Sequence, residues 1–491
     1  MYVRTLAGPQ WGVRHGETLI GGHFFGGPCD QATPKDVVHS PWDGRVVGTV
    51  AEASLHDGRV AVQAAREAFE TWRSSPRRTR QKLLRNVARL VRERSEEFAE
   101  LLSDEIGKPI RWAWAEVERL AITFDLAADA VSSYGFEAVP VDTDPRGVGC
   151  SLTVERRPLG VVLAIVPYNW PFNLAAHKIA PALAVGNTVV VKPSRRAALS
   201  TLTLARCIHE AGCPPGVVNA VNVSGPEAQV LAGMDEVAMV SFTGSPEVGW
   251  GLKDALPRKR VSLELGADSA AVVFADADLD AAIPKLVNGA YGYAGQVCIS
   301  VQRILVQRAV YADVRERLIA ATEACPYGDP AEESVVCGPM ISAQEADRVM
   351  EWLAEAEAAG ARVLAGGHRI GPVITPTLVE DVPGTVRLGC REVFGPVVAL
   401  AVFDSPEEAW AKVNASAYGI HAGVFTRDLR TVREAFDRLD VGGVVVNDAP
   451  TLRFDSMPYG GVKQSGFGRE GVRYTMDEMT EPKALLTRWD A

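Results

Sequence analysis

The chain has 491 residues, which is long enough for roughly three domain-sized units and too long for one ordinary core. Hydrophobic residues make up 47% and charged residues 23% of the sequence, a globular composition that argues against disorder. The formal net charge of -10 argues against non-specific binding to nucleic acids or to anionic membranes, so small molecules are the expected partners.

The cysteines and the apolar segments indicate the compartment. Eight cysteines are scattered without a CxxC pair, which favours reduced thiols over a disulfide framework or a zinc site. The histidines form no HxxxH or HExxH pattern, so no metal site is predicted. The amino terminus, MYVRTLAGPQ, lacks the apolar core of a signal peptide, and the longest apolar run, VVLAIVP, falls far short of the ~20 residues of a membrane helix. We therefore expect a cytoplasmic protein without a membrane partner.

The first predicted elements are helices. Residues 59–72 carry apolar side chains at helical spacing, and an amphipathic charged pattern continues from Arg77 to Leu102 as predicted helix. A further helix is expected after Pro109, because proline suits a first helical turn and the apolar period resumes at Ile110.

A hairpin is predicted next. Strand-like runs at residues 136–141 and 151–156 flank the turn-rich segment DTDPRGVG, so we expect a hairpin that reaches away from the globule. An exposed strand edge is an aggregation hazard, and the hairpin therefore needs a partner.

From Gly160 onward, apolar runs alternate with helical patterns, which predicts a parallel α/β sheet. Such sheets bind ligands at the carboxyl ends of their strands, where Pro167, Lys192 and Thr243 lie. The segment from Gly244 through Ser245 to Gly249 follows a strand and opens a helix, which is typical of a phosphate-binding turn. An ordinary capped helix is the alternative, because serine followed by proline is also a good cap.

A second alternation of strands and helices begins near Val261 and predicts another α/β domain. This region carries Glu264 at its start and Cys298 further on. We expect the active site in the cleft between the two sheets, where ligand sites commonly form.

Three residue types suggest aldehyde oxidation. A thiolate, here Cys298, can add to an aldehyde and make a tetrahedral adduct from which hydride leaves more easily. An amide such as Asn169 can stabilise the oxyanion, and a carboxylate such as Glu264 can activate water to hydrolyse the resulting thioester. Gly292 and Gly295 keep the backbone near the thiol free of side-chain bulk. Each residue alone has an ordinary reading: a small core thiol for Cys298, turn chemistry for Asn169.

In combination, the sequence resembles the aldehyde dehydrogenase superfamily over nearly its whole length. Seven blocks carry the resemblance in order: PYNWPFNL, GNTVVVKPS, SFTGSPEVG, LELGA, GQVCIS, EVFGPV and MPYGGVKQSGFGREG. The resemblance implies that Cys298 is the nucleophile, Glu264 the base and Asn169 an oxyanion donor. It further implies cofactor contacts by Pro167, Lys192, Ser194, Arg195, Thr243, Gly244, Ser245, Gly249, Glu392 and Phe394.

The resemblance also implies a domain plan. It is an α/β fold with a Rossmann-type cofactor domain at residues 1–133 and 158–260 and a second α/β, catalytic domain at residues 261–465. Residues 134–157 and 478–491 form a protruding oligomerisation hairpin and tail, with the tail adding a strand to a neighbouring subunit. A homodimer or homotetramer is therefore expected.

The cofactor is expected to be NADP, or else NAD. Most relatives hold a glutamate at the position of Arg195, where a carboxylate accepts hydrogen bonds from the adenosine ribose of NAD. An arginine would instead pair with a 2'-phosphate, and Arg196 follows it. The alternative is that both are solubilising surface arginines.

The expected substrate is a small polar or anionic aldehyde, because Arg119 and Arg453 fall where related enzymes hold an anion. Val297, which precedes the thiol, departs from the arginine that acid-handling relatives often place there. An aromatic or aliphatic aldehyde is the alternative, since four aromatic residues, Trp112, Trp114, Trp170 and Phe454, could form an apolar tunnel.

Two other functions stay open. One is an enzyme that passes the acyl group to coenzyme A or hydrolyses acyl esters, and the other is a structural protein without activity on the same fold. Glu264 favours water as the acceptor, because the acylating branch commonly has asparagine there. Ala267 and Asp268 replace the usual glycine and lysine of LELGGK, a change that we expect to alter packing beside the base.

Overall fold

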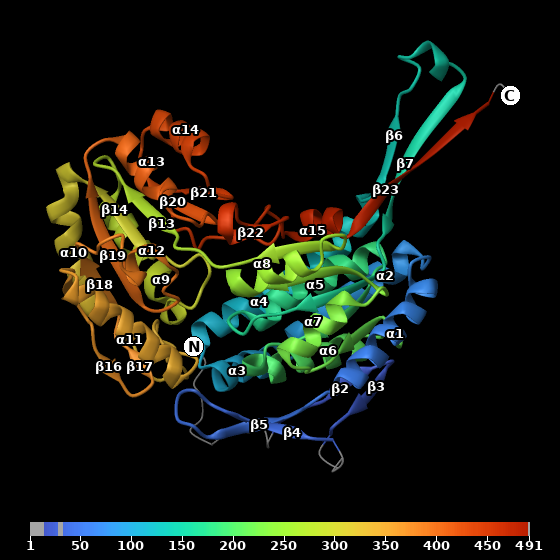
Figure 1. Ribbon diagram of the computed structural model, residues 1–491, viewed down its shortest axis with the longest axis horizontal. Helices are drawn as coiled ribbons and strands as arrows, with labels where there is room; N and C mark the ends of the chain where they lie inside the picture. Colours follow the sequence, from blue (N-terminus) through green and yellow to red (C-terminus); the bar gives the residue numbers. More distant parts are fainter. Residues whose placement is uncertain (1–13, 28–32, 490–491) are drawn as a thin grey trace.

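The computed structural model describes residues 14–27 and 33–489. Two α/β lobes stand side by side, and a narrow three-stranded sheet projects from the first lobe beyond the body of the molecule (Figure 1). The predicted α/β architecture with two sheets and a protruding hairpin is confirmed. Among the described residues, no helix is long and apolar enough to cross a membrane.

The first lobe is built on an eight-stranded sheet. The strands from β12 to β10 are parallel, and antiparallel strands close both edges. Both faces of the central strands are covered by helices, as in parallel sheets generally, so β8 and β9 are apolar throughout. In spatial order the strands are β22 (Gly466–Phe467), β12 (Arg260–Glu264), β11 (Val237–Thr243), β8 (Val161–Ile165), β9 (Thr188–Lys192), β10 (Val218–Ala220), β2 (Thr18–Ile20) and β3 (His23–Phe25).

The helices of this lobe form two layers on the sheet. Val161 and Leu163 of β8 pack with one layer, whereas Val162 and Ala164 pack with the other, as the two-residue period of a strand requires. The first layer contains α1 (Leu55–Trp72), α7 (Gly225–Gly233) and α8 (Pro246–Ala255). The second contains α2 (Arg77–Glu93), α3 (Ser95–Ile106), α4 (Ile110–Ser133), α5 (Pro171–Val185), α6 (Ala198–Glu210) and α15 (Val472–Glu478).

The amphipathic pattern predicted as helix from Arg77 to Leu102 is two helices. Arg94 leaves helical geometry with φ -115° and ψ 23°, and α3 begins at the next residue. Glu96 and Glu97 in the first turn of α3 favour a new helix start there, because acidic side chains stabilise the positive end of the helix dipole. The apolar period continues across the break and hides it in the sequence.

The second lobe is a seven-stranded sheet, parallel except for β15 at one edge. Its strands in spatial order are β15 (Arg362–Ala365), β18 (Thr377–Glu380), β19 (Val397–Phe403), β14 (Arg303–Gln307), β13 (Ala270–Val273), β20 (His421–Phe425) and β21 (Gly443–Val446). Its helices are α9 (Leu279–Tyr291), α10 (Tyr311–Glu323), α11 (Ala343–Ala358), α12 (Arg387–Cys390), α13 (Pro406–Asn414) and α14 (Leu429–Arg438). Two small sheets complete the fold: β1 (Arg14–Gly16), β5 (Val46–Ala51) and β4 (Lys35–His39), and β16 (Arg369–Ile370) with β17 (Val373–Ile374).

The boundary between the lobes needs a correction. The sequence places it before Val261, but β12 pairs with β11 from Met239↔Arg260 to Thr243↔Glu264 and so belongs to the first sheet. The second sheet starts only at β13. Glu264 therefore ends a strand of the first lobe, whereas Cys298 belongs to the second.

The projecting sheet consists of β6 (Phe136–Val139), β7 (Cys150–Pro158) and β23 (Thr480–Arg488), with β7 in the middle. The predicted hairpin is present. The tail strand β23 pairs with its own β7 over nine residues and lies at an edge of this sheet, so its addition to the sheet of a neighbouring subunit stays a prediction. The short helix α15 precedes β23 and delivers it to the base of β7 (Figure 1). Pairing of the hairpin across subunits stays a prediction.

Candidate active site

The parallel strands of the first lobe bring candidate residues to one edge. Strands β9, β8, β11 and β12 are adjacent and parallel, so their carboxyl ends lie together. Lys192, Thr243 and Glu264 are the last residues of their strands, and Asn169 follows β8 by four residues. The sequence-based expectation of a site at this edge is therefore matched by the positions of the residues.

Cys298 lies on a loop of the second lobe between α9 and β14. The backbone before it is left-handed at Tyr293, Ala294 and Gly295, with φ of 53°, 54° and 65°. A Cβ on Gly295 would come within 2.3 Å of the carbonyl oxygen of Gly395, so only glycine fits there. Strained non-glycine residues next to a candidate nucleophile are a mark of a functional loop.

The Cys298 thiol is within hydrogen-bond distance of the Tyr459 hydroxyl, with 2.8 Å between Sγ and Oη. Burial raises the pKa of this thiol to about 11, and the hydrogen bond with Tyr459 opposes the rise. The thiol is thus protonated at neutral pH and needs a base, or a bound ligand, to become a thiolate. The sequence analysis missed Tyr459, although it lies within the MPYGG block.

Asn169 is buried beside the cysteine loop. Its Nδ2 donates to the carbonyl oxygen of Gln296 at 3.0 Å, two residues before Cys298. An amide nitrogen has two hydrogens, so one remains for a second acceptor. The structure thus brings Asn169 to the loop of the predicted nucleophile.

Glu264 is a buried carboxyl, 3% exposed, and neither of its oxygens has a hydrogen-bond partner among the described residues. Burial raises the pKa of Glu264 well above its usual value, and the charge of Glu470 adds to the rise. A Cβ on Gly460 would come within 3.0 Å of Glu264 Oε1, and the adjacent Tyr459 contacts the Cys298 thiol, so the carboxyl lies near that thiol. A carboxyl whose pKa is raised toward neutrality suits a general base.

A buried ion pair lies behind Glu264. Lys178 of α5 donates to Glu470 at 2.8 Å and to Ser241 of β11 at 3.2 Å. Burial opposes ionisation of Glu470, but the charges of Lys178 and Arg453 outweigh it and keep the pKa of Glu470 below its usual range. The sequence analysis missed both residues of this pair. The available signal was a lysine on a mostly apolar helix, since buried lysines are rarely unpaired.

Cys298 opens into a cavity of about 350 Å³. Aromatic side chains form much of its wall, including Trp112, Trp170 and Tyr293, and Val297 lies beside the thiol. The predicted Arg119 and Arg453 also line it. Phe454 and Trp114, which the alternative interpretation placed in an apolar tunnel, both lie outside this wall. The Phe454 side chain is 62% exposed.

The two arginines differ in what they already bind. Arg119 makes a two-pronged contact with Asp455, Nε to Oδ2 at 3.2 Å and Nη2 to Oδ1 at 2.6 Å, and His177 also contacts that carboxylate at 2.8 Å. Arg453 stacks on the Tyr459 ring at 3.6 Å and reaches Glu470 only at 3.4 Å. Its Nε is buried without a partner among the described residues. Arg453 therefore has donor capacity to spare, whereas Arg119 is committed to Asp455.

The predicted cofactor residues fit a dinucleotide. The hydroxyl of Thr243 is shielded from solvent without a partner in the described chain, and the Lys192 ammonium likewise has no described hydrogen-bond acceptor. Burial lowers the pKa of Lys192, and the charge of Arg195 adds to this effect. Ser245 caps α8 through the amide of Val248, so the helix N-terminus faces this edge as an anion site requires.

Gly249 and Ser194 have structural tasks in this region. A Cβ on Gly249 would come within 2.4 Å of Leu265 Cδ2, so the glycine lets α8 pack closely on the chain after β12. Ser194 accepts a hydrogen bond from the Arg196 amide at 3.4 Å and starts the turn that carries Arg195.

Glu392 is held by the backbone of the LELGAD segment and lies within reach of the Asp268 charge. The Ala267 amide donates to Glu392 Oε1 at 3.1 Å, and a Cβ on Gly266 would come within 2.1 Å of the same carboxylate. Burial raises the pKa of Glu392 to about 8, and the charge of Asp268 adds to the rise. The departure from LELGGK thus changes the surroundings of Glu392 as well as packing beside the base.

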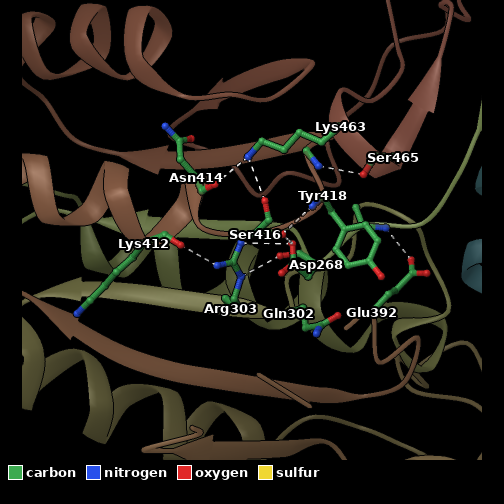
Figure 2. Close-up of polar contacts among 12 residues, drawn as sticks. Asp268, Gln302, Arg303, Glu392, Lys412, Asn414, Ser416, Tyr418, Lys463 and Ser465 are labelled. Carbon is green, nitrogen blue, oxygen red and sulfur yellow. Dashed lines mark hydrogen bonds and ion pairs between the residues drawn. The ribbon is translucent and has the colours of Figure 1, made fainter. Parts of the chain in front are cut away.

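Asp268 is the centre of a polar network (Figure 2). Arg303 pairs with its carboxylate at 3.3 Å and donates to its carbonyl oxygen at 3.0 Å, while Ser416 donates to the carboxylate at 2.6 Å. Gln302 next to Arg303 binds the backbone on both sides of Glu392, at the Arg391 oxygen and the Val393 amide. The network therefore ties the loop after β12 to the turn that carries Glu392.

Phe394 has a left-handed backbone with φ 46°, rare for an aromatic residue. Its ring meets Tyr168 edge to face at 6.1 Å between centroids. Tyr168 lies between Pro167 and Asn169, so the predicted Phe394 and Pro167 come from the two lobes to neighbouring positions.

Arg195 is exposed and already paired. Its Nη2 contacts Asp36 at 2.7 Å and also contacts Glu52. The charge of Arg195 is thus offset by two carboxylates that the sequence analysis did not place beside it.

Comparison with known proteins fits this geometry. The sequence profile of the Aldehyde dehydrogenase family matches residues 30–485. A 3-sulfolactaldehyde dehydrogenase of Priestia aryabhattai is 40% identical over 466 residues, which cover 95% of this chain and 97% of the relative.

Two solved structures are similar over almost their full length. Aldehyde dehydrogenase 21 from Physcomitrella patens, in complex with the reaction product succinate, has a TM-score of 0.94 at 36% identity and covers 98% of this chain and 100% of its own. Glyceraldehyde-3-phosphate dehydrogenase GapN from Methanocaldococcus jannaschii, complexed with NADP, has a TM-score of 0.89 at 36% identity, with coverage of 93% and 99%.

The chain belongs to the aldehyde dehydrogenase family. It is an enzyme of the class that oxidises aldehydes to carboxylic acids with NAD or NADP, and the predicted class is confirmed.

Proposed function

We propose that this protein oxidises a small anionic aldehyde to its carboxylate, with Cys298 as nucleophile and Glu264 as base. One observation carries the proposal: the Cys298 thiol opens into a cavity that also contains Arg453, and Glu264 lies buried beside it without a partner among the described residues. The nucleophile and the anion-binding group thus share one cavity, and the base lies near the nucleophile outside the cavity wall.

The residues divide the reaction into two stages. The Cys298 thiol releases its proton to solvent, and its sulfur forms a bond to the aldehyde carbon as the carbonyl π bond breaks. The electron pair moves to the oxygen, and the Asn169 amide stabilises this oxyanion. Glu392 and Phe394 would hold the nicotinamide end of a bound cofactor, which would supply the acceptor for the hydride that leaves this carbon. Glu264 then removes a proton from water, which attacks the thioester, breaks the carbon–sulfur bond and releases the acid and the thiol.

An anionic substrate is supported by the cavity and by the relatives. Arg453 offers an unused buried Nε, and an arginine matches a carboxylate, phosphate or sulfonate well. The relatives named above are a sulfolactaldehyde dehydrogenase, a glyceraldehyde-3-phosphate dehydrogenase and an enzyme whose product is succinate. The aromatic walls favour a second candidate, a neutral aromatic aldehyde, whose ring Trp112 and Trp170 would contact.

A panel of aldehydes tests the proposal. The reduction of NADP or NAD is followed at 340 nm with three-carbon and four-carbon aldehydes that carry a carboxylate, phosphate or sulfonate, and with neutral analogues of equal length. We expect higher kcat/KM for the anionic members and the same rate with and without coenzyme A. Equal rates for neutral aromatic aldehydes would favour the second candidate, and a strict need for coenzyme A would contradict hydrolysis.

We further propose that the enzyme uses NADP, alone or together with NAD. Lys192, Thr243, Ser194, Ser245, Glu392 and Phe394 would hold the dinucleotide, and Arg195 would pair with its 2'-phosphate. To do so, Arg195 must exchange or share its contacts with Asp36 and Glu52.

Arg195→Glu is expected to lower the ratio of kcat/KM for NADP over NAD by at least about tenfold, because a charged contact is lost and repulsion is added. The matched variant Asp36→Asn should change the ratio in the opposite direction, since it frees Arg195 from one of its two carboxylates. Steady-state kinetics with both cofactors measures these ratios. A native enzyme that already prefers NAD tenfold would contradict the role of Arg195.

A further inference from the structure

A second cavity, of about 410 Å³, lies far from Cys298 in the sequence and in the fold. It is enclosed by the loop between α1 and α2, the first turn of α2, the end of α4 and the base of β7. Five arginines and one glutamate are the charged residues of its wall: Arg73, Arg77, Arg80, Arg156, Arg157 and Glu155. A wall with four positive charges in excess attracts anions.

Three of these arginines have a carboxylate partner in the described chain, and Arg77 and Arg80 do not. Arg73 pairs with Glu70, outside the wall, at 3.6 Å. Arg77 donates to two neutral acceptors, the carbonyl oxygens of Val131 at 2.9 Å and Tyr134 at 2.8 Å. Arg157 forms an ion pair with Glu155, the one glutamate of the wall, at 2.5 Å. Arg156 pairs with Asp477 outside the wall at 3.4 Å.

Arg80 is the centre of the argument. Its guanidinium makes no hydrogen bond or ion pair with any described residue, and its Nε is shielded from solvent. Burial lowers the pKa of Arg80, and the charge of Arg77 adds to this effect. The Arg80 side chain is half-buried, and its shielded Nε–H is costly, because burial removes water there and no hydrogen-bond acceptor replaces it. The Ser75 hydroxyl is shielded and unpartnered at the same wall.

The position of the arginines on α2 increases this cost. The first turn of α2 contains Arg77, Arg78 and Arg80 and no acidic residue, and Pro76 provides no side-chain cap. The helix dipole places partial positive charge at this end, where cations are unfavourable and anions favourable. One bound anion would compensate both the partial positive charge of the helix N-terminus and the charge of the Arg80 guanidinium.

We propose that this cavity binds a phosphate-bearing anion, with Arg80 as its central contact. Arginine matches phosphate geometry with paired donors, and the Ser75 hydroxyl can donate a further hydrogen bond. The volume exceeds that of a free phosphate ion, and Val131, Phe136 and Met476 in the wall offer apolar contact to an attached carbon group. The ligand class is therefore a small organic phosphate, or inorganic phosphate as its minimal form.

Calorimetric titration with inorganic phosphate and with glycerol 3-phosphate, at constant ionic strength, tests the site. Arg80→Gln is expected to weaken binding at least about tenfold, since it removes a charged hydrogen-bond donor. Arg78→Gln is the matched control, because Arg78 lies on the same turn but outside the cavity wall. Arg195→Gln controls for phosphate bound at the cofactor site. Tighter binding of the ester assigns the site to an organic phosphate, and equal binding assigns it to free phosphate.

Three results would overturn the proposal: no phosphate binding beyond that of chloride, unchanged binding in Arg80→Gln, or equal loss in Arg78→Gln. Light scattering adds a check on assembly. If Arg80→Gln changes the number of subunits and leaves phosphate binding unchanged, the cavity accommodates another copy of the chain instead. Without phosphate, Arg80→Gln should melt no lower than the wild type, because the variant removes an unpaired charge. Should it melt lower, Arg157→Gln replaces it in the titration and must weaken phosphate binding for the proposal to stand.

Discussion

Replacing Cys298 with alanine is expected to abolish aldehyde oxidation, and replacing Glu264 with glutamine is expected to leave a thioester on the enzyme. Without the sulfur, no adduct forms, so turnover should fall by at least about a thousandfold. Without the carboxylate, the first stage proceeds but water is not activated, so one burst of reduced cofactor is followed by slow turnover. Mass spectrometry of the intact protein should show an acyl adduct in Glu264→Gln and none in Cys298→Ala.

The other seven cysteines supply the control for this experiment. Cys390 is exposed and outside the cavity, so Cys390→Ala should retain turnover and acylate at Cys298 like the wild type. Full activity in Cys298→Ala would contradict the assignment of the nucleophile. Rapid deacylation in Glu264→Gln would show that another group activates the water.

Replacing Arg453 with glutamine is expected to raise KM for an anionic aldehyde about ten- to a hundredfold. A lost hydrogen bond to a charged group is worth about 1.5 to 3 kcal/mol, which corresponds to that range. A neutral aldehyde of the same length should be affected far less. Arg119→Gln should raise KM less than Arg453→Gln does, because Asp455 already occupies the Arg119 guanidinium. Steady-state kinetics with one charged and one neutral aldehyde measures the difference.

The stability of each variant separates binding from structure. Removing Arg119 leaves the Asp455 carboxylate with His177 alone, so this variant should melt lower even where its KM changes little. If Arg453→Gln raises KM equally for the charged and the neutral aldehyde, the arginine supports Tyr459 and Glu470 and does not bind substrate. Equal effects of the two arginine variants on the charged substrate would contradict the distinction between them.

The sequence predicted the parts of the fold that depend on local period. The strands and helices from Val161 to Ala255 repeat in apolar runs and amphipathic turns, and the structure has each of them near the expected bounds. It could not place Arg94 between two helices, because the apolar face continues across the break. It also could not assign β12 to the first sheet, since sheet membership depends on pairing with β11 and leaves no mark on β12 itself.

The candidate site shows the same division. Cys298, Glu264 and Asn169 could be proposed from the sequence because short blocks around them indicate their chemistry. Tyr459 was not, since a tyrosine in a glycine-rich turn has no special pattern until the fold sets it 2.8 Å from the thiol. Likewise, Arg195 looked free in the sequence, but Asp36 of β4 and Glu52, the residue after β5, come from about 150 residues earlier.

The ion pair of Lys178 and Glu470 makes the packing of the first lobe depend on a part of the chain that is synthesised much later. The two residues are 292 positions apart, and nearly the whole second lobe is synthesised between them. On the ribosome, α5 emerges long before its carboxylate, and a buried lysine without a counterion is strongly unfavourable. The first lobe therefore cannot reach its final packing until the second lobe has left the ribosome. A chain that stops short of Glu470 lacks more than a peripheral tail, because it lacks the charge that allows Lys178 to be buried.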